Sequence, residues 1–200
     1  MKKETKQPYY IFLDIDGTLY DATYVQHIYG PFTSHVEYPV LKPESINAVN
    51  LLLRSLESKF NTKLVITSSK RENMRECVEY LHFNKLDYNK PIFCTPFIPG
   101  VRGDKIVSYM QEQGEVGFKF PTLKNFIARM LYEKNNSDFE NYVVLEDTPK
   151  KVKKQIPKSR IIYSNHDKCS ITEEQVRKYL KTNNIPVIEL DSLEHLIGFN

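Results

Sequence analysis

Two carboxylates, Asp14 and Asp16, stand directly behind an uninterrupted apolar run from Tyr9 to Leu13. Residues two apart in an extended segment point to the same side, so both side chains are expected to converge on one small volume. Gly17 then lets the chain turn away without filling that volume. Carboxylates held this close repel each other unless a proton or a hard cation such as Mg²⁺ relieves them. The pattern predicts a phosphoryl-transfer site, and its alternative is a simple acidic turn.

A second apolar run, Leu64 to Ile66, ends in hydroxyl side chains, Thr67 and Ser68. The continuous apolar character of both runs is typical of strands that are buried on two faces. A Thr or Ser at the end of such a strand can donate a hydrogen bond to a phosphate oxygen. Thr67 is the first candidate for this role, and Ser68 is the second.

Further acid follows a third apolar run, Tyr142 to Leu145, in the pair Glu146 and Asp147. These carboxylates could bind the same metal directly or through water. A buried strand that ends in an acidic turn is also a common structural feature. The pair therefore supports a metal site only in combination with the other two runs.

Basic residues suitable for binding phosphate lie between the second and third runs. Gly103 and Asp104 suit the start of a helix, and the neighbouring Arg102 and Lys105 could each neutralise phosphate charge. Surface cations are plentiful in this chain, so the choice between the two stays open at this point.

The ordered set Asp14-x-Asp16-Gly17-Thr18, Thr67, a basic residue and Glu146-Asp147 resembles the haloacid dehalogenase superfamily of phosphohydrolases. The resemblance implies that Asp14 is a nucleophile that forms an aspartyl-phosphate, and that Asp16 is the general acid and base. It also implies that the backbone carbonyl of Asp16 binds the metal. An aspartate at position 16 points away from a dehalogenase and toward a phosphatase or phosphotransferase.

A narrower resemblance is to small, nearly capless members of the superfamily, including the domains found in RNA repair proteins. It is carried by Val65–Arg71, Arg102-Gly103-x-x-Ile106, Val143–Asp147 and Ile171–Val176. In that pattern the phosphate-binding cation is Lys105 or Arg102, with Lys105 ranked slightly ahead. Lys124 is a third candidate, because the superfamily lysine usually opens the helix before the last acidic strand.

The expected site falls into three groups. The catalytic residues are Asp14, Asp16, Thr67 and Lys105, the substrate-binding residues are Thr18, Ser68, Arg71 and Arg102, and the Mg²⁺-binding residues are Asp14, Asp16, Glu146 and Asp147.

Strands and helices alternate along the chain without an obvious linker, internal repeat or low-complexity stretch. Helices are expected from Pro43 onward, at 72–81, at 104–113, along the stripe 123–131 and after a capping box Ser170-x-x-Glu173. Further strands are expected at 91–95, 160–163 and 186–190. The sum predicts an α/β fold, a Rossmann-like three-layer α/β/α sandwich with a central parallel sheet and a minimal cap, as one domain over residues 1–200.

Composition agrees with a globular protein of 200 residues and net charge +3. No apolar run reaches the ~18 residues that cross a bilayer, and residues 1–7 carry no apolar signal core. The three cysteines are scattered and no histidine has another His or Cys at ligand spacing, so neither a disulfide framework nor a zinc site is expected. We expect a cytoplasmic protein without membrane contact, a monomer or a weak homodimer.

Substrate choice in this superfamily comes largely from cap insertions. The gap between Tyr20 and Glu44 suits an aromatic-rich flap rather than a folded cap, which predicts an open site for large substrates such as phosphorylated protein or nucleic-acid ends. The basic stretch 150–160 could meet a polyanion, although a solvated helix face is the commoner explanation because the net charge is only +3. The flap aromatics could stack a base or merely cover the sheet edge.

The sequence as a whole predicts a Mg²⁺-dependent phosphomonoester hydrolase. A phosphotransferase is the enzymatic alternative. A binding or signalling module that keeps the fold but hydrolyses nothing is the alternative from another class.

Overall fold

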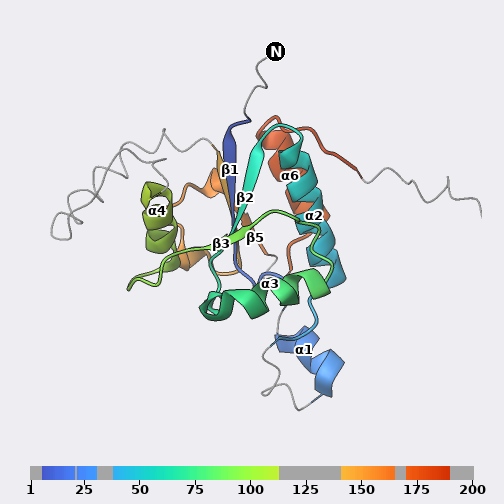
Figure 1. The fold of residues 1–200 in the computed structure, drawn as a ribbon. Helices are drawn as coiled ribbons and strands as arrows, with labels where there is room; N and C mark the ends of the chain where they lie inside the picture. Colours follow the sequence, from blue (N-terminus) through green and yellow to red (C-terminus); the bar gives the residue numbers. More distant parts are fainter. Residues whose placement is uncertain (1–5, 21, 31–37, 113–140, 165–169, 190–200) are drawn as a thin grey trace, which may run out of the picture.

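The computed structural model describes residues 6–20, 22–30, 38–112, 141–164 and 170–189. These residues form a five-stranded parallel sheet in the order β3-β2-β1-β4-β5, with helices on both faces (Figure 1). The strands are β1 (Pro8–Leu13), β2 (Asn61–Ile66), β3 (Ile92–Cys94), β4 (Tyr142–Glu146) and β5 (Ile161–Tyr163). The α/β architecture with a parallel sheet, predicted from the apolar runs, is confirmed.

The strand order places β1 at the centre of the sheet. Leu13 pairs with Ile66 of β2 on one side and with Leu145 of β4 on the other. The chain moves outward from β1 to β3 and then returns to β4, so the topological switch point lies between β1 and β4. Ligands of open parallel sheets bind outside the carboxyl ends of the strands at such a point.

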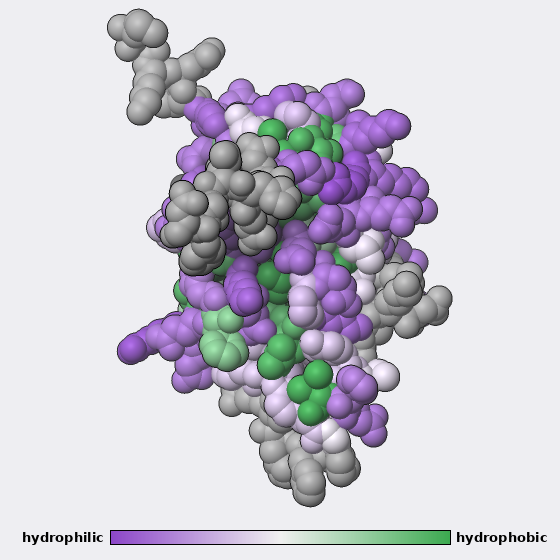
Figure 2. Space-filling view, turned by 90° about the vertical axis from the view of Figure 1, so that its right-hand side faces the viewer, coloured by the Kyte–Doolittle hydropathy of each residue, from purple (hydrophilic) through white to green (hydrophobic). Residues whose placement is uncertain are grey.

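One face of the sheet is covered by α2 (Pro43–Glu57), α3 (Met74–Phe83) and α6 (Glu173–Thr182). Ile11 and Leu13 point to this face, and their alternation follows the two-residue period of a strand. The outer surface over α2 and α6 is largely hydrophilic, with small separate hydrophobic areas (Figure 2).

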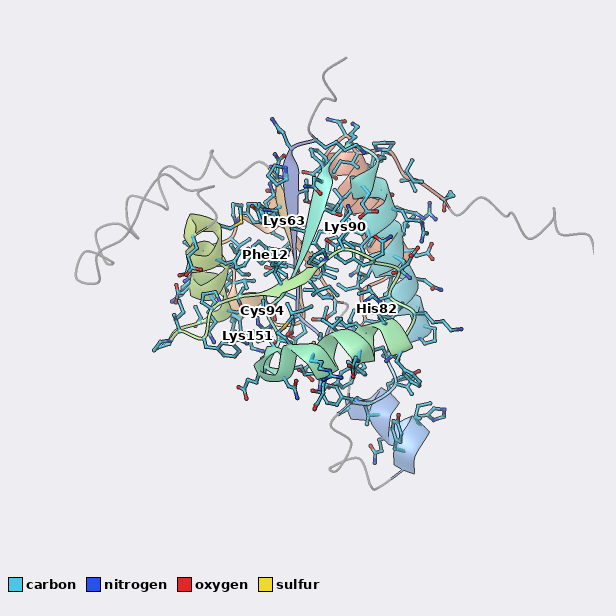
Figure 3. The ribbon with its side chains drawn as sticks, viewed as in Figure 1. Phe12, Lys63, His82, Lys90, Cys94 and Lys151 are labelled. Carbon is cyan, nitrogen blue, oxygen red and sulfur yellow. The ribbon has the colours of Figure 1, made fainter. Side chains whose placement is uncertain are left out.

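The opposite face packs on α4 (Arg102–Glu112). Tyr10 and Phe12 point to this side, and Phe12 extends from β1 toward α4 (Figure 3). The Phe12 ring meets Tyr109 of α4 edge to face, with 5.9 Å between the ring centroids. This packing fixes α4 against the centre of the sheet.

Several expected elements differ in the structure. The capping box that opens α6 is Thr172 with Gln175, not Ser170 with Glu173, because the backbone leaves the extended conformation only after Thr172. Residues 186–189 form no strand: Pro186 lacks an N–H donor, and Ile188 donates its backbone N–H to Ser55 of α2 instead. Residue 190, the helix expected at 123–131 and Lys124 lie outside the described residues.

Two segments contain structure that the sequence did not indicate. The gap after Tyr20 holds a short helix, α1 (Ala22–Tyr29), which buries only Val25. The basic stretch forms two 3₁₀ turns, Pro149–Lys151 and Lys158–Arg160, rather than one helix face. Within the described part of the chain, no helix combines the length and the apolar character needed to cross a bilayer.

Candidate functional site

Asp14 is the first residue after β1 and its side chain is fully buried. Its backbone N–H continues the sheet by donating to the Leu145 carbonyl at 3.1 Å, which fixes the residue at the carboxyl edge. One carboxylate oxygen, Oδ2, contacts Arg102 Nη1 at 2.8 Å and accepts a hydrogen bond from Thr18 Oγ1 at 3.4 Å. The other, Oδ1, has no hydrogen-bond partner among the described residues. The carboxylate is therefore oriented on one side and unsatisfied on the other.

Three carboxylates meet at the switch point between β1 and β4. Oxygen atoms of Asp14, Glu146 and Asp147 lie within 4.8 Å of one another. Burial raises the pKa of the Asp14 carboxyl; the Arg102 charge partly offsets this, and the neighbouring acids add to it. Burial likewise raises the pKa of Glu146. Three closely spaced carboxylates, two of them buried, offer oxygen donors that suit a hard divalent cation.

Arg102 provides the positive charge within this cluster. It is the first residue of α4, and its Nη1 lies 2.5 Å from Glu146 Oε1 and 4.0 Å from Asp147 Oδ1, in addition to its contact with Asp14. The start of α4 is held in place by Asp104, which accepts a hydrogen bond from Gln155 Nε2 at 2.8 Å.

The ranking of the two cations changes accordingly. The sequence placed Lys105 slightly ahead, but Lys105 lies one helical turn beyond Arg102 and forms no ion pair with a described carboxylate. Because α4 begins at Arg102 itself, that side chain extends from the helix end into the cluster. The contacts therefore favour Arg102 as the cation of the acidic site.

Thr67 is the first residue after β2, where its backbone N–H donates to the Leu13 carbonyl at 2.9 Å. Its side chain is buried, and its Oγ1 has no hydrogen-bond partner among the described residues. Because β1 and β2 pair directly, this hydroxyl lies at the same edge as Asp14. A buried hydroxyl without a partner at this position is suited to donating to an anionic ligand.

Asp16 is held by contacts that are separate from those of the acidic cluster. Its carboxylate accepts hydrogen bonds from Ser68 Oγ at 2.7 Å and from the Tyr20 hydroxyl, and Lys70 Nζ lies 3.6 Å away. Its side chain is 43% exposed, which leaves it accessible to a ligand. The ammonium group of Lys70 is itself held over the Tyr38 ring at 4.9 Å.

Gly17 makes the close approach between the first and third acidic segments possible. Its φ is +77°, in the left-handed region, and a Cβ at this position would lie 2.4 Å from Asp147 Oδ2. Any side chain here would displace that carboxylate from the cluster. The glycine that the sequence indicated as a turn residue thus also makes room for Asp147.

The remaining expected substrate residues lie at the same edge. Thr18 and Ser68 are buried and donate to Asp14 and Asp16, so their contacts orient those carboxylates. Arg71 is buried behind the Thr67 turn, where its Nη1 donates to the carbonyls of Thr67 and Ser68. In Figure 3, Cys94 marks the carboxyl end of β3, and Lys151 lies in the 3₁₀ turn Pro149–Lys151 that follows β4.

Sequence reasoning missed the role of two residues. Tyr20 was considered only as a flap aromatic, and Lys70 was not assigned a role, yet both contact Asp16. Their closeness in sequence to expected site residues could have indicated them, because Tyr20 follows Asp16 by four residues and Lys70 follows Ser68 by two.

Comparisons of the chain with protein-family models, with curated proteins and with solved structures find no match.

Proposed function

We propose that this protein is a Mg²⁺-dependent phosphomonoester hydrolase of the haloacid dehalogenase type, with Asp14 as its nucleophile. The observation that carries the proposal is the state of Asp14: it is fully buried, one oxygen is held by Arg102, and the other has no partner among the described residues. A buried carboxylate oxygen without a partner lowers the stability of the folded protein unless a bound ligand contacts it.

The donor set fits Mg²⁺. Asp14, Glu146 and Asp147 offer carboxylate oxygens within 4.8 Å, and Oδ1 of both Asp14 and Asp147 accepts no hydrogen bond from the described residues. These three side chains, together with the Asp16 carbonyl in the family pattern, would hold the ion. When bound, the ion would neutralise negative charge on the phosphate oxygens.

The side chains of the site carry out the separate steps of phosphoryl transfer. Asp14 attacks phosphorus with a carboxylate oxygen, which forms an aspartyl-phosphate and releases the leaving oxygen. Thr67 donates to a phosphoryl oxygen, and Arg102 stabilises the charge that accumulates around Asp14. Asp16, partly exposed, gives a proton to the leaving group and then takes one from the attacking water.

The contacts around Asp16 explain how one residue can serve both steps. The Ser68 hydroxyl and the Tyr20 hydroxyl donate to its carboxylate and fix its orientation, and Lys70 Nζ lies 3.6 Å from the same group. Asp16 therefore keeps one position, at the exposed rim of the site, during both half-reactions. This arrangement suits a large leaving group, such as a phosphorylated nucleic-acid end or a phosphoprotein.

The test is Mg²⁺-dependent phosphate release from an aryl phosphate. The wild-type protein is compared with Asp14→Asn and with Asp87→Asn, a matched change at an exposed aspartate after α3. Asp14→Asn is expected to lower the rate about 1,000-fold or more, and Asp87→Asn to leave it unchanged. Equal activity of all three proteins, or activity without a divalent ion, would reject the proposal.

A further inference from the structure

Arg71 is a buried arginine whose charge is not matched by an acid. Its residue is 6% exposed, it forms no ion pair with a described carboxylate, and its Nε has no hydrogen-bond partner among the described residues. Its Nη1 donates to the carbonyls of Thr67 and Ser68 at 3.2 and 2.8 Å, which holds the guanidinium rigidly beside the Thr67 turn. A buried charge is usually paired with an opposite charge. The simplest partner for the Arg71 guanidinium is therefore an anion from outside the chain.

Lys105 adds a second unpaired cation. It is half-buried, it forms no ion pair with a described carboxylate, and it follows Arg102 by three residues on α4, on the same side of the helix. Burial lowers the pKa of Lys105, and the charges of Arg71 and Arg102 lower it further. Of these three, only Arg102 is paired with the acidic cluster.

An exposed aromatic ring covers this cationic region. The guanidinium carbon of Arg71 lies 4.7 Å from the centroid of the Phe97 ring, and Phe97 is 60% exposed. Ile98 and Val101, in the same loop before α4, are also exposed. A phenyl ring stacked on arginine and open to solvent is a surface on which a flat heterocycle can stack.

We propose that Arg71, Lys105 and Phe97 form a second subsite, beside the Asp14 centre, that binds an additional phosphate and the base of a phosphorylated nucleotide. The proposal rests on the proposed function, because it assigns the substrate class of the same site. Unpaired Arg and Lys side chains select a second phosphate, and Phe97 selects the base. The nucleotide could be a nucleoside bisphosphate or the end of a nucleic-acid chain, which share this chemistry.

The experiment compares kcat/KM for five substrates: a nucleoside 3′-monophosphate, a nucleoside 3′,5′-bisphosphate, a short 3′-phosphorylated oligonucleotide, a phosphopeptide and an aryl phosphate. The bisphosphate or the oligonucleotide is expected to exceed the monophosphate at least ten-fold. A larger gain for the oligonucleotide identifies a chain end, and an equal gain identifies the small nucleotide. A preference for the phosphopeptide, or no gain from the second phosphate, would overturn the proposal.

Two variants locate the effect. Phe97→Ala is expected to lower kcat/KM for the preferred nucleotide about ten-fold relative to that for the aryl phosphate, because a base stacked on an aromatic ring contributes about that much affinity. Lys105→Gln is expected to remove most of the advantage of the second phosphate. The matched controls are Phe83→Ala, at a 79% exposed ring at the end of α3, and Lys153→Gln, at an exposed lysine. Equal losses for every substrate would contradict a separate subsite.

A binding measurement separates this proposal from the proposed function. Fluorescence anisotropy of a labelled 3′-phosphorylated oligonucleotide, with the bisphosphate as competitor, reports the subsite in Asp14→Asn protein that does not turn over. Phe97-dependent binding of the oligonucleotide, together with no aryl phosphate hydrolysis by the wild-type protein, would reject the hydrolase alone. Hydrolysis of the aryl phosphate with no Phe97-dependent binding would reject the subsite alone.

Discussion

Replacing Arg102 by glutamine tests the electrostatics of the acidic cluster most sharply. Asp14 and Glu146 are both fully buried, and Arg102 contacts them at 2.8 and 2.5 Å with 14% of its own side chain exposed. Removing one partner of a buried ion pair typically costs about 3–5 kcal/mol, because the remaining charge is left without compensation. Arg102→Gln is therefore expected to lower the free energy of unfolding by about that amount in chelator at neutral pH.

The assay is urea unfolding of the wild type and two variants, with chelator and with excess Mg²⁺. Arg75→Gln is the matched control, because Arg75 pairs with Glu79 on an exposed helix surface, where such pairs contribute only about 0.3–0.5 kcal/mol. Mg²⁺ is expected to restore much of the stability of Arg102→Gln, since a divalent ion relieves the same carboxylates. If Arg102→Gln loses no more stability than Arg75→Gln in chelator, the reasoning about the cluster is wrong.

Three further outcomes follow from the site. Gly17→Ala is expected to weaken Mg²⁺ binding at least ten-fold in calorimetry, because its Cβ would collide with the Asp147 carboxylate of the proposed metal site. The control Gly30→Ala, at a positive φ in open space, carries only backbone strain. Burial raises the pKa of Asp14, so above about pH 4 the folded metal-free protein binds more protons than the unfolded chain. The free energy of unfolding of the metal-free protein should therefore fall as the pH rises to neutrality, by up to about 1.4 kcal/mol per pH unit for each extra proton bound. Tyr20→Phe should lower kcat for aryl phosphate hydrolysis about ten-fold, because it removes a hydrogen bond that orients Asp16.

Each of these predictions has a contradicting result. Equal Mg²⁺ affinity in the two glycine variants would reject the role of Gly17. A metal-free stability that rises between pH 5 and 7.5, measured by urea unfolding, would contradict the charge argument, and excess Mg²⁺ should flatten the predicted slope. The control for Tyr20→Phe is Tyr24→Phe, whose hydroxyl lies 3.5 Å from the Leu41 carbonyl on the same segment. Equal kcat values in the two tyrosine variants would contradict the role of Tyr20 in orienting Asp16.

The sequence predicted the sheet and the meeting of three of its strand ends. Continuous apolar runs are strong evidence for buried parallel strands, and their carboxyl ends share one edge, so Asp14, Thr67 and Glu146 could be expected together. Their relative order was set by the return of the chain from β3 to β4, which no local pattern encodes. The register of Leu13 against Ile66 and Leu145 then aligned the three ends.

The choice of cation was harder to predict. Helix periodicity defines which residues share a face, but it leaves the first residue of a helix uncertain by a turn. Arg102 contacts the acids because α4 begins there, a position fixed by the bond between Asp104 and the distant Gln155. A shift of the helix start by one turn would have favoured Lys105 instead.

The contacts of Asp16 illustrate a second limit. The residues that hold it come from the turn before α1 and from the 3₁₀ segment Ser69–Asn73 with its N-cap Ser68, and neither has an apolar period. The same reason explains the missed helix α1, which buries a single side chain and so lacks the stripe from which helices are predicted.

The central claim is that Asp14 carries the phosphoryl group during turnover. The most direct measurement is rapid acid quench of the Mg²⁺-loaded protein with a ³²P-labelled substrate, followed by peptide mapping and a test of hydroxylamine lability. The account predicts a transient, hydroxylamine-labile label on the peptide that contains Asp14, absent from Asp14→Asn. Turnover without any protein-bound label, or a label on another residue, would contradict it.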